Sequence, residues 1–200
     1  GRCSFAPDAA FARYLAERGV GMPDFRGSYD LTVLGARRAL VEALATARYQ
    51  TPTVDQLIAL TAIGVTPDYI ADLSRNGFHP DDLDDLMAFA ALRIDGAYAG
   101  AMLRAGAGKL RSKDLIALRA VGVTPAYVAE LVDAGLRDVS ADTLAQLKAI
   151  GVDGAYLRDL ATVGFAQHAA DELTAMRAVG VTAEDVRHAR AAGIANPTAE

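Results

Sequence analysis

The fold is decided by the stretch between residues 53 and 77, which reads TVDQLIALTAIGVTPDYIADLSRNG. Its first half has large apolar side chains at the spacing of one helix face: Leu57, Leu60 and Ile63. Gly64 can adopt the left-handed conformation that ends a helix. Thr66 and Pro67 are the residue types preferred at the N-cap and the first position of the next helix. The stretch therefore predicts two helices of about 10–12 residues each, too short to be stable alone in water.

This pattern recurs every 29 residues, which is the signature of a repeat architecture. Four positions keep the period independently. The tyrosine series is Tyr69, Tyr98, Tyr127 and Tyr156, and the glycine series is Gly77, Gly106, Gly135, Gly164 and Gly193. The leucine series is Leu57, Leu86, Leu115, Leu144 and Leu173, and the alanine series is Ala62, Ala91, Ala120, Ala149 and Ala178. We therefore expect helix pairs stacked in register.

A second, 58-residue period lies above the first. The start of the second helix alternates between Thr and Asp: Thr66, Asp95, Thr124, Asp153 and Thr182. Each of these residue types can accept a hydrogen bond from a helix N-terminus. Because "Val-Thr-Pro" and "Asp-Gly-Ala-Tyr" each recur after two units, the alternation indicates that a pair of repeats was duplicated as a block.

Weaker copies of the pattern extend toward the N-terminus. Phe11, Leu15 and Gly19 lie 58 residues before Tyr69, Leu73 and Gly77, and Leu31 and Gly35 lie 29 before Leu60 and Gly64. The prediction is an all-α, α-α solenoid with divergent terminal repeats, because terminal repeats of solenoids face water on one side. We expect one continuous solenoid domain with tails at 1–8 and 195–200, divergent repeats over 9–52 and regular repeats over 53–194.

The composition argues against several functional classes. The net charge is −5, whereas a nucleic-acid binder usually carries a basic excess that neutralises phosphates. The longest apolar run, residues 86–92, is far shorter than the roughly 20 residues that a membrane span needs, so we expect no membrane insertion. The single cysteine, Cys3, excludes an internal disulfide and has no nearby histidine. We expect no cofactor and no catalytic activity.

The tyrosine series is the first candidate binding site. Four tyrosines at one repeat position form an aromatic row that is able to grip an extended peptide. The alternative is core packing, with each hydroxyl reaching a backbone group or water. The tyrosines are in helical phase with the apolar residues Leu73, Leu131 and Leu160, which favours packing.

A basic row is the second candidate. Arg119, Lys148 and Arg177 share one repeat position in the last turn of the first helix. Such a row is suited to an acidic segment or to phosphates. The alternative is that cations near a helix C-terminus simply complement the helix dipole, and this local explanation is favoured.

Three further features are explained more simply by structure than by chemistry. The acidic segment 79–85, His-Pro-Asp-Asp-Leu-Asp-Asp, lacks the spacing of a calcium loop and lies where a helix start favours negative charge. His168 and His188 have no partner at metal-ligand spacing. Arg93 replaces a turn glycine, and either a local bend or a contact site would account for it.

The segment DLIALRAVGVTPAYVAEL at 114–131 resembles short helical repeats of bacterial proteins. Such repeats occur downstream of membrane metallopeptidase-like sensors and other regulators. The resemblance implies an accessory, extracytoplasmic interaction region of a larger bacterial protein. It carries over no catalytic residue, because the peptidase zinc motif His-Glu-x-x-His is absent from this chain.

We therefore expect a non-catalytic solenoid that binds a protein or peptide partner. The alternative is a nucleic-acid-binding repeat that uses Arg119, Lys148 and Arg177. It predicts a steep salt dependence of binding.

Overall fold

The computed structural model describes residues 4–107, 109–137, 139–165 and 169–194. The chain divides into two compact units, Gly1–Gly96 and Ala97–Glu200, here called the N-terminal and C-terminal units. Every described residue in a regular element lies in a helix, and the fold is the expected all-α solenoid of short repeats.

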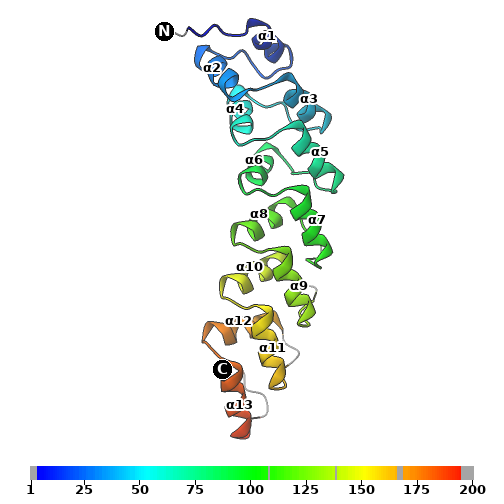
Figure 1. The fold of residues 1–200 in the computed structure, drawn as a ribbon, viewed down its shortest axis with the longest axis vertical. Coiled ribbons are helices and arrows are strands. Elements are labelled where there is room, and N and C mark those ends of the chain that lie inside the picture. Colours follow the sequence, from blue (N-terminus) through cyan, green and yellow to red (C-terminus); the bar gives the residue numbers. More distant parts are fainter. Residues whose placement is uncertain (1–3, 108, 138, 166–168, 195–200) are drawn as a thin grey trace. The chain divides into compact units, whose positions relative to one another are not determined.

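Helices follow one another with short connections along both units (Figure 1). The N-terminal unit contains α1 (Ala9–Glu17), α2 (Phe25–Leu34), α3 (Arg38–Thr46), α4 (Val54–Ala62), α5 (Pro67–Arg75), α6 (Leu83–Ala91) and the first residue of α7 (Gly96–Arg104). The C-terminal unit contains the rest of α7, α8 (Ser112–Ala120), α9 (Pro125–Asp133), α10 (Ala141–Ala149), α11 (Gly154–Thr162), α12 (Ala170–Ala178) and α13 (Ala183–Ala191).

Each repeat supplies one helix to each of two stacked series (Figure 1). Even-numbered helices are the first helices of the repeats, and odd-numbered helices are the second helices. In the N-terminal unit, α2 packs on α4, α4 on α6, and α3 on α5. In the C-terminal unit, α8 packs on α10 and α10 on α12, while α9 packs on α11 and α11 on α13. Stacking of like helices buries the apolar face that a nine-residue helix cannot bury alone.

The turn between the two helices of a repeat has the predicted geometry. Gly64 has φ +83°, and the Val65 N–H donates to the Leu60 carbonyl at 2.9 Å, which closes a Schellman motif. The Thr66 hydroxyl then accepts from the Tyr69 N–H at 3.1 Å as the N-cap of α5. Thr124, Asp153 and Thr182 cap their helices with equivalent side-chain hydrogen bonds.

The helices are slightly shorter than predicted. Among the described helices α2 has ten residues and the others have nine, against the expected 10–12. The difference comes from the cap residues, which match the sequence pattern but have non-helical backbone angles at the N-cap. Each sequence segment therefore includes a cap at either end.

The weak N-terminal register is present in the structure. Leu15, Leu31 and Leu44 are buried in α1, α2 and α3, and Gly19 and Gly35 have positive φ as the later turn glycines do. Arg93 also keeps the common turn. It has φ +55°, and the Ile94 N–H still donates to the Phe89 carbonyl at 2.8 Å, so the substitution leaves the turn itself unaltered.

In the described part of the chain no single helix is both long and apolar enough to cross a membrane. Three consecutive helix pairs reach the required length and composition only when both helices are counted together, and each pair is sharply bent.

Candidate functional site

The four repeated tyrosines each donate a hydrogen bond to the backbone of the following repeat. The pairs are Tyr69 Oη to Ile94 O at 2.7 Å, Tyr98 Oη to Val123 O at 2.8 Å, Tyr127 Oη to Val152 O at 2.7 Å, and Tyr156 Oη to Val181 O at 2.9 Å. Each acceptor immediately precedes the N-cap position of a second helix, in the tight turn. Each tyrosine therefore fastens its repeat to the turn of the next one, and we call this contact the tyrosine staple.

Burial raises the pKa of these phenols, so that they stay neutral hydrogen-bond donors to a higher pH than a free tyrosine does. Burial, with Asp153 and Glu130 nearby, raises the pKa of Tyr127 to about 12. Burial also raises the pKa of Tyr98 and Tyr156, while Arg119 and Arg177 act in the opposite direction. Tyr69 is half-buried, and its pKa is raised by burial and by carboxylates that include Asp95.

In the C-terminal unit the two predicted series meet. Arg119 Cζ lies 4.6 Å from the centre of the Tyr98 ring, Lys148 Nζ lies 4.5 Å from that of Tyr127, and Arg177 Cζ lies 4.8 Å from that of Tyr156. These distances are within the range of cation–π contacts. The cations come from the last turns of α8, α10 and α12. We call the three of them the cation row.

One tyrosine serves both contacts at each step of the row. In the first, the Tyr98 hydroxyl donates to Val123 O, and the face of the same ring carries Arg119, four residues before Val123. The ring is thus held by its hydroxyl while its face orients the cation. All three cations are half-buried, so part of each side chain is open to solvent. Guanidinium and ammonium groups in this position are suited to carboxylates or phosphates.

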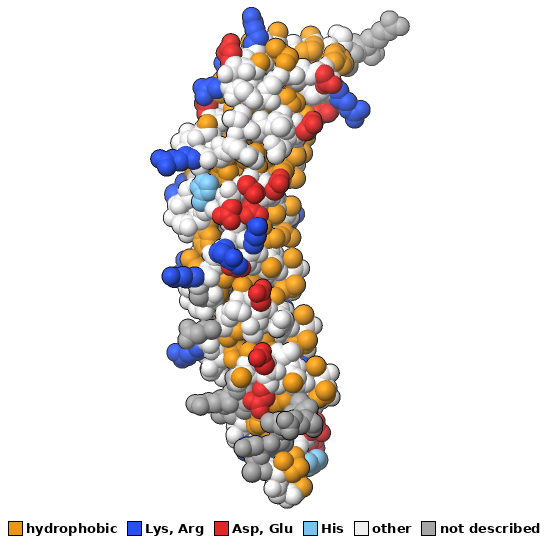
Figure 2. All heavy atoms as spheres, turned by 180° about the vertical axis from the view of Figure 1, so that it is seen from behind, with side chains coloured by type: hydrophobic (Ala, Val, Ile, Leu, Met, Phe, Trp, Pro, Cys, Tyr) orange, Lys and Arg blue, Asp and Glu red, His pale blue; other side chains and the backbone are white. Residues whose placement is uncertain are grey.

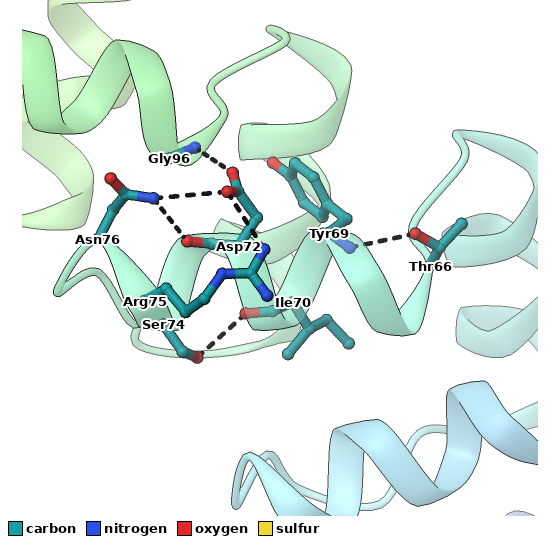
Figure 3. A network of polar contacts seen from close by, with 8 residues as sticks. All are labelled: Thr66, Tyr69, Ile70, Asp72, Ser74, Arg75, Asn76 and Gly96. Atoms are coloured by element: carbon teal, nitrogen blue, oxygen red, sulfur yellow. Dashed lines mark hydrogen bonds and ion pairs between the residues drawn. The ribbon is translucent and has the colours of Figure 1, made fainter.

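A polar network in the N-terminal unit explains half of the 58-residue alternation (Figure 3). Asp72 Oδ2 accepts from the Gly96 N–H at 2.8 Å, and Asn76 Nδ2 donates to the Asp72 carbonyl at 2.9 Å. A Cβ at position 96 would lie 2.8 Å from that carbonyl oxygen. Glycine is therefore required here, and a proline would lack the N–H that Asp72 accepts.

The equivalent glycine of the C-terminal unit is held in a similarly close contact. A Cβ at Gly154 would lie 2.9 Å from the Glu130 Cβ and 3.0 Å from the Glu130 carbonyl oxygen. An "Asp-Gly" pair at the start of the second helix thus marks a repeat in which that helix begins in close contact with the second helix of the preceding repeat. The sequence signalled this through the alternation, but it did not identify Asp72 or Glu130 as the neighbours.

The acidic segment 79–85 is part of a helix start and a turn. Asp82 caps α6 by accepting from the Asp85 N–H at 2.8 Å. The His79 ring stacks on Tyr49 with 4.6 Å between centroids, and its Nε2 lies 2.6 Å from the Ala47 carbonyl oxygen. Within the described residues no group of three or more His, Cys, Asp or Glu side chains is arranged to hold a metal ion.

The remaining sequence candidates are His188, Cys3 and His168. His188 Nε2 is 4.0 Å from Glu184 Oε1, one turn away on α13. Cys3 and His168 lie outside the described residues.

The chain matches no family model and no curated protein. The similarity to bacterial regulator repeats therefore stays a prediction that depends on the segment at 114–131.

Proposed function

We propose that this chain is a non-catalytic repeat scaffold, and that its C-terminal unit binds an acidic peptide segment of a partner protein along the cation row. The observation that carries the proposal is the fixed placement of Arg119, Lys148 and Arg177, one per repeat, each over a stapled tyrosine ring. A regular row of partly exposed cations matches an extended chain that presents carboxylates at intervals.

The cations are not needed to hold the repeats together. Tyr69 makes the same staple, to Ile94 O at 2.7 Å, although Ala90 occupies the repeat position of the cation. Because repeat stacking does not require the contact between cation and tyrosine ring, the cations are available to bind a partner. The helix dipole also favours a cation at this point, but the last turn of α6 contains none, and the nearest cation is Arg93 in the turn that follows.

The overall charge of the chain favours a peptide over a nucleic acid. The face seen in Figure 2 mixes acidic, basic and apolar side chains, and the chain as a whole has a net charge of −5. Phosphate backbones are bound by an extended excess of positive charge, whose counterion release makes the affinity fall steeply with salt. A short row of three cations on a chain of net negative charge is better matched to a few carboxylates.

The test measures binding of two fluorescent probes by anisotropy at several salt concentrations. One probe is an unstructured Glu-rich peptide and the other is a duplex DNA oligonucleotide. We expect the triple variant Arg119→Gln, Lys148→Gln, Arg177→Gln to bind the peptide about tenfold more weakly, since each contact contributes about 0.5 kcal/mol.

The matched control removes the same charge from exposed arginines of the same unit: Arg104→Gln, Arg137→Gln, Arg187→Gln. This variant should keep most of the affinity. An equal loss in both variants would show general charge attraction and overturn the proposal. Tight, salt-sensitive DNA binding that only the row variant loses would establish the nucleic-acid alternative instead.

A further inference from the structure

The outward face of α2 exposes a line of large apolar side chains. Phe25, Tyr29 and Val33 are spaced four residues apart, so they share one helix face, and they are 66%, 47% and 64% exposed. Isolated apolar side chains on a surface are ordinary, but an aligned set of this size marks an interaction surface.

The repeat register shows what this face is built to contact. Phe25 and Tyr29 occupy the repeat positions of Val54 and Ile58 in α4. Those two side chains line the groove between α4 and α2, and a Cβ at Gly27 of α2 would lie 3.3 Å from Val54 Cγ1. Leu83 of α6 occupies the repeat position of Phe25 and Val54. It is fully buried, and α6 packs on α4. The positions of Phe25 and Tyr29 are therefore the ones at which the first helix of a repeat contacts the first helix of the preceding repeat.

Part of the face is already covered by an aromatic side chain from the extended segment before α1. The Phe5 ring makes edge-to-face contacts with Phe25 at 5.7 Å and with Tyr29 at 5.3 Å between centroids. Phe5 is half-buried, yet Phe25 stays mostly exposed beneath it. An aromatic group is thus bound here by geometry that aromatic pairs prefer, but one ring does not fill the surface.

An end-to-end contact between copies of this chain does not suit the face. Glu172 of α12 occupies the repeat position of Gly27 in α2. Gly27 faces α4, the first helix of the next repeat, so Glu172 is expected to lie on the side of α12 that a following first helix would contact. Such a contact would place the Glu172 carboxylate against the apolar Phe25 ring and would remove water from the carboxylate. At the edges of the α2 face, Arg26 and Asp30 lie 3.8 Å apart and their charges balance, so recognition depends on apolar burial.

We propose that the α2 face binds an amphipathic helix of a partner protein, stacked as α4 stacks on α6, and that Phe5 is displaced when it binds. The helix presents an apolar ridge with a small residue opposite Phe25, as Gly27 lies opposite Val54 within the chain. The surface belongs to the N-terminal unit and is independent of the cation row, so the two proposals fail separately.

The probe is a fluorescent, hydrocarbon-stapled peptide of residues 53–64 that carries Gln56→Ala, since Gln56 occupies the repeat position of Gly27. This helix is chosen because α4 already covers a large apolar residue, Leu83, at the equivalent position of α6. The full 200-residue chain is titrated against it by anisotropy. We expect saturable binding that weakens about tenfold or more in Phe25→Ser, Tyr29→Ser, as removal of central aromatic anchors does. Phe5→Ala should tighten binding, because the competing ring is gone.

The control is Val179→Ser, which removes an apolar side chain that is 67% exposed at the C-cap of α12 and should leave the affinity unchanged. Circular dichroism confirms that each variant is folded. Absence of saturable binding in both the natural chain and Phe5→Ala would overturn the proposal. Self-association in sedimentation that Phe25→Ser, Tyr29→Ser abolishes, without competition by the peptide, would assign the face to a second copy and also overturn it. An unchanged affinity in Phe5→Ala would refute the displacement step.

Discussion

Tyr69 in the N-terminal unit and Tyr127 in the C-terminal unit make the same hydrogen bond in different surroundings. Each hydroxyl donates to a turn carbonyl of the next repeat at 2.7 Å. Lys148 lies over the Tyr127 ring, whereas the equivalent position beside Tyr69 is Ala90. The hydrogen bond is thus the constant part of the repeat and the cation is the variable part.

The turns differ between the units in a complementary way. Among the described residues the two non-glycine residues with positive φ are Arg48 and Arg93, and both are in the N-terminal unit. The C-terminal unit has glycine at the corresponding turns, including Gly122 and Gly151. The N-terminal unit therefore has arginines at two of its turns, whereas the C-terminal unit has cations over the repeated tyrosines. In the N-terminal unit Arg18 and Arg38 lie over the ring of Tyr14, which is outside the tyrosine series.

The largest expected effect is the loss of all staples in alkali. Burial raises the pKa of Tyr127 to about 12, while the unfolded phenol has its ordinary value of 10.0. Between these values the unfolded chain loses a proton that the folded chain keeps, so stability held below pH 10 is lost as pH rises toward 12. The urea midpoint, followed by circular dichroism, should fall steeply in this range.

The control for the alkaline transition is Tyr127→Phe, which cannot ionise at that position. Its midpoint should fall less steeply with pH than that of the natural chain. A midpoint that stays constant above pH 10 would show that the staples do not depend on neutral phenols.

Truncation of the staple has the next largest effect. Tyr69→Ala and Tyr127→Ala should each lower the free energy of unfolding by about 3 kcal/mol, as removal of a large buried ring does. Both hydroxyls make the same hydrogen bond, but Tyr69 is half-buried and Tyr127 is buried, so the loss at Tyr127 should be the larger by about 1 kcal/mol. Urea unfolding measures both, and a much larger loss at Tyr127 would make the cation part of the stacking contact.

Removal of the hydroxyl alone isolates the hydrogen bond. Tyr69→Phe and Tyr127→Phe should each lower the free energy of unfolding by about 1–2 kcal/mol, since a turn carbonyl that is part-buried beside Tyr69 and buried beside Tyr127 loses its donor. The measurement is again urea unfolding, at neutral pH. If Tyr127→Phe were harmless while Tyr69→Phe was costly, the cation contact would be compensating for the lost bond.

The differences among these sites also show what sequence alone predicts. The turn at Gly64 and the cap at Thr66 depend on residues within a few positions, so their local chemistry predicts them correctly. The tyrosine and cation series were both found by periodicity, but their pairing was not. It depends on how one repeat stacks on the next, which register does not specify.

The α2 face also shows that the repeat register does not predict contacts between repeats. Register places Phe25 at the position of Leu83 and Ser112, which are buried in α6 and α8, and only the structure shows Phe25 exposed beneath Phe5. The tight contacts at Gly96 and Gly154 likewise involve a neighbouring repeat. Contacts within a repeat were predictable, whereas contacts between repeats required coordinates.

Relief of backbone strain has a smaller effect. Arg93 has φ +55°, a conformation that costs a non-glycine residue about 1–2 kcal/mol. Arg93→Gly should therefore raise the free energy of unfolding by about 0.5–1 kcal/mol, after the entropy cost of glycine. The reverse change Gly122→Arg, in the C-terminal unit, should lower the free energy of unfolding by a similar amount. Thermal unfolding followed by circular dichroism measures both variants. Destabilisation by Arg93→Gly would mean that the arginine side chain makes a stabilising contact.

The smallest expected effect is that of moving a cation onto the bare tyrosine. Ala90→Arg places a guanidinium at the repeat position from which Arg119 covers Tyr98, and the gain should be about 0.5 kcal/mol. Arg119→Ala should lose a similar amount in the C-terminal unit. The interaction is isolated by repeating Ala90→Arg in a Tyr69→Leu background, where no ring remains. An equal gain in both backgrounds would assign the effect to the helix dipole, and the difference between the units would then be one of helix ends alone.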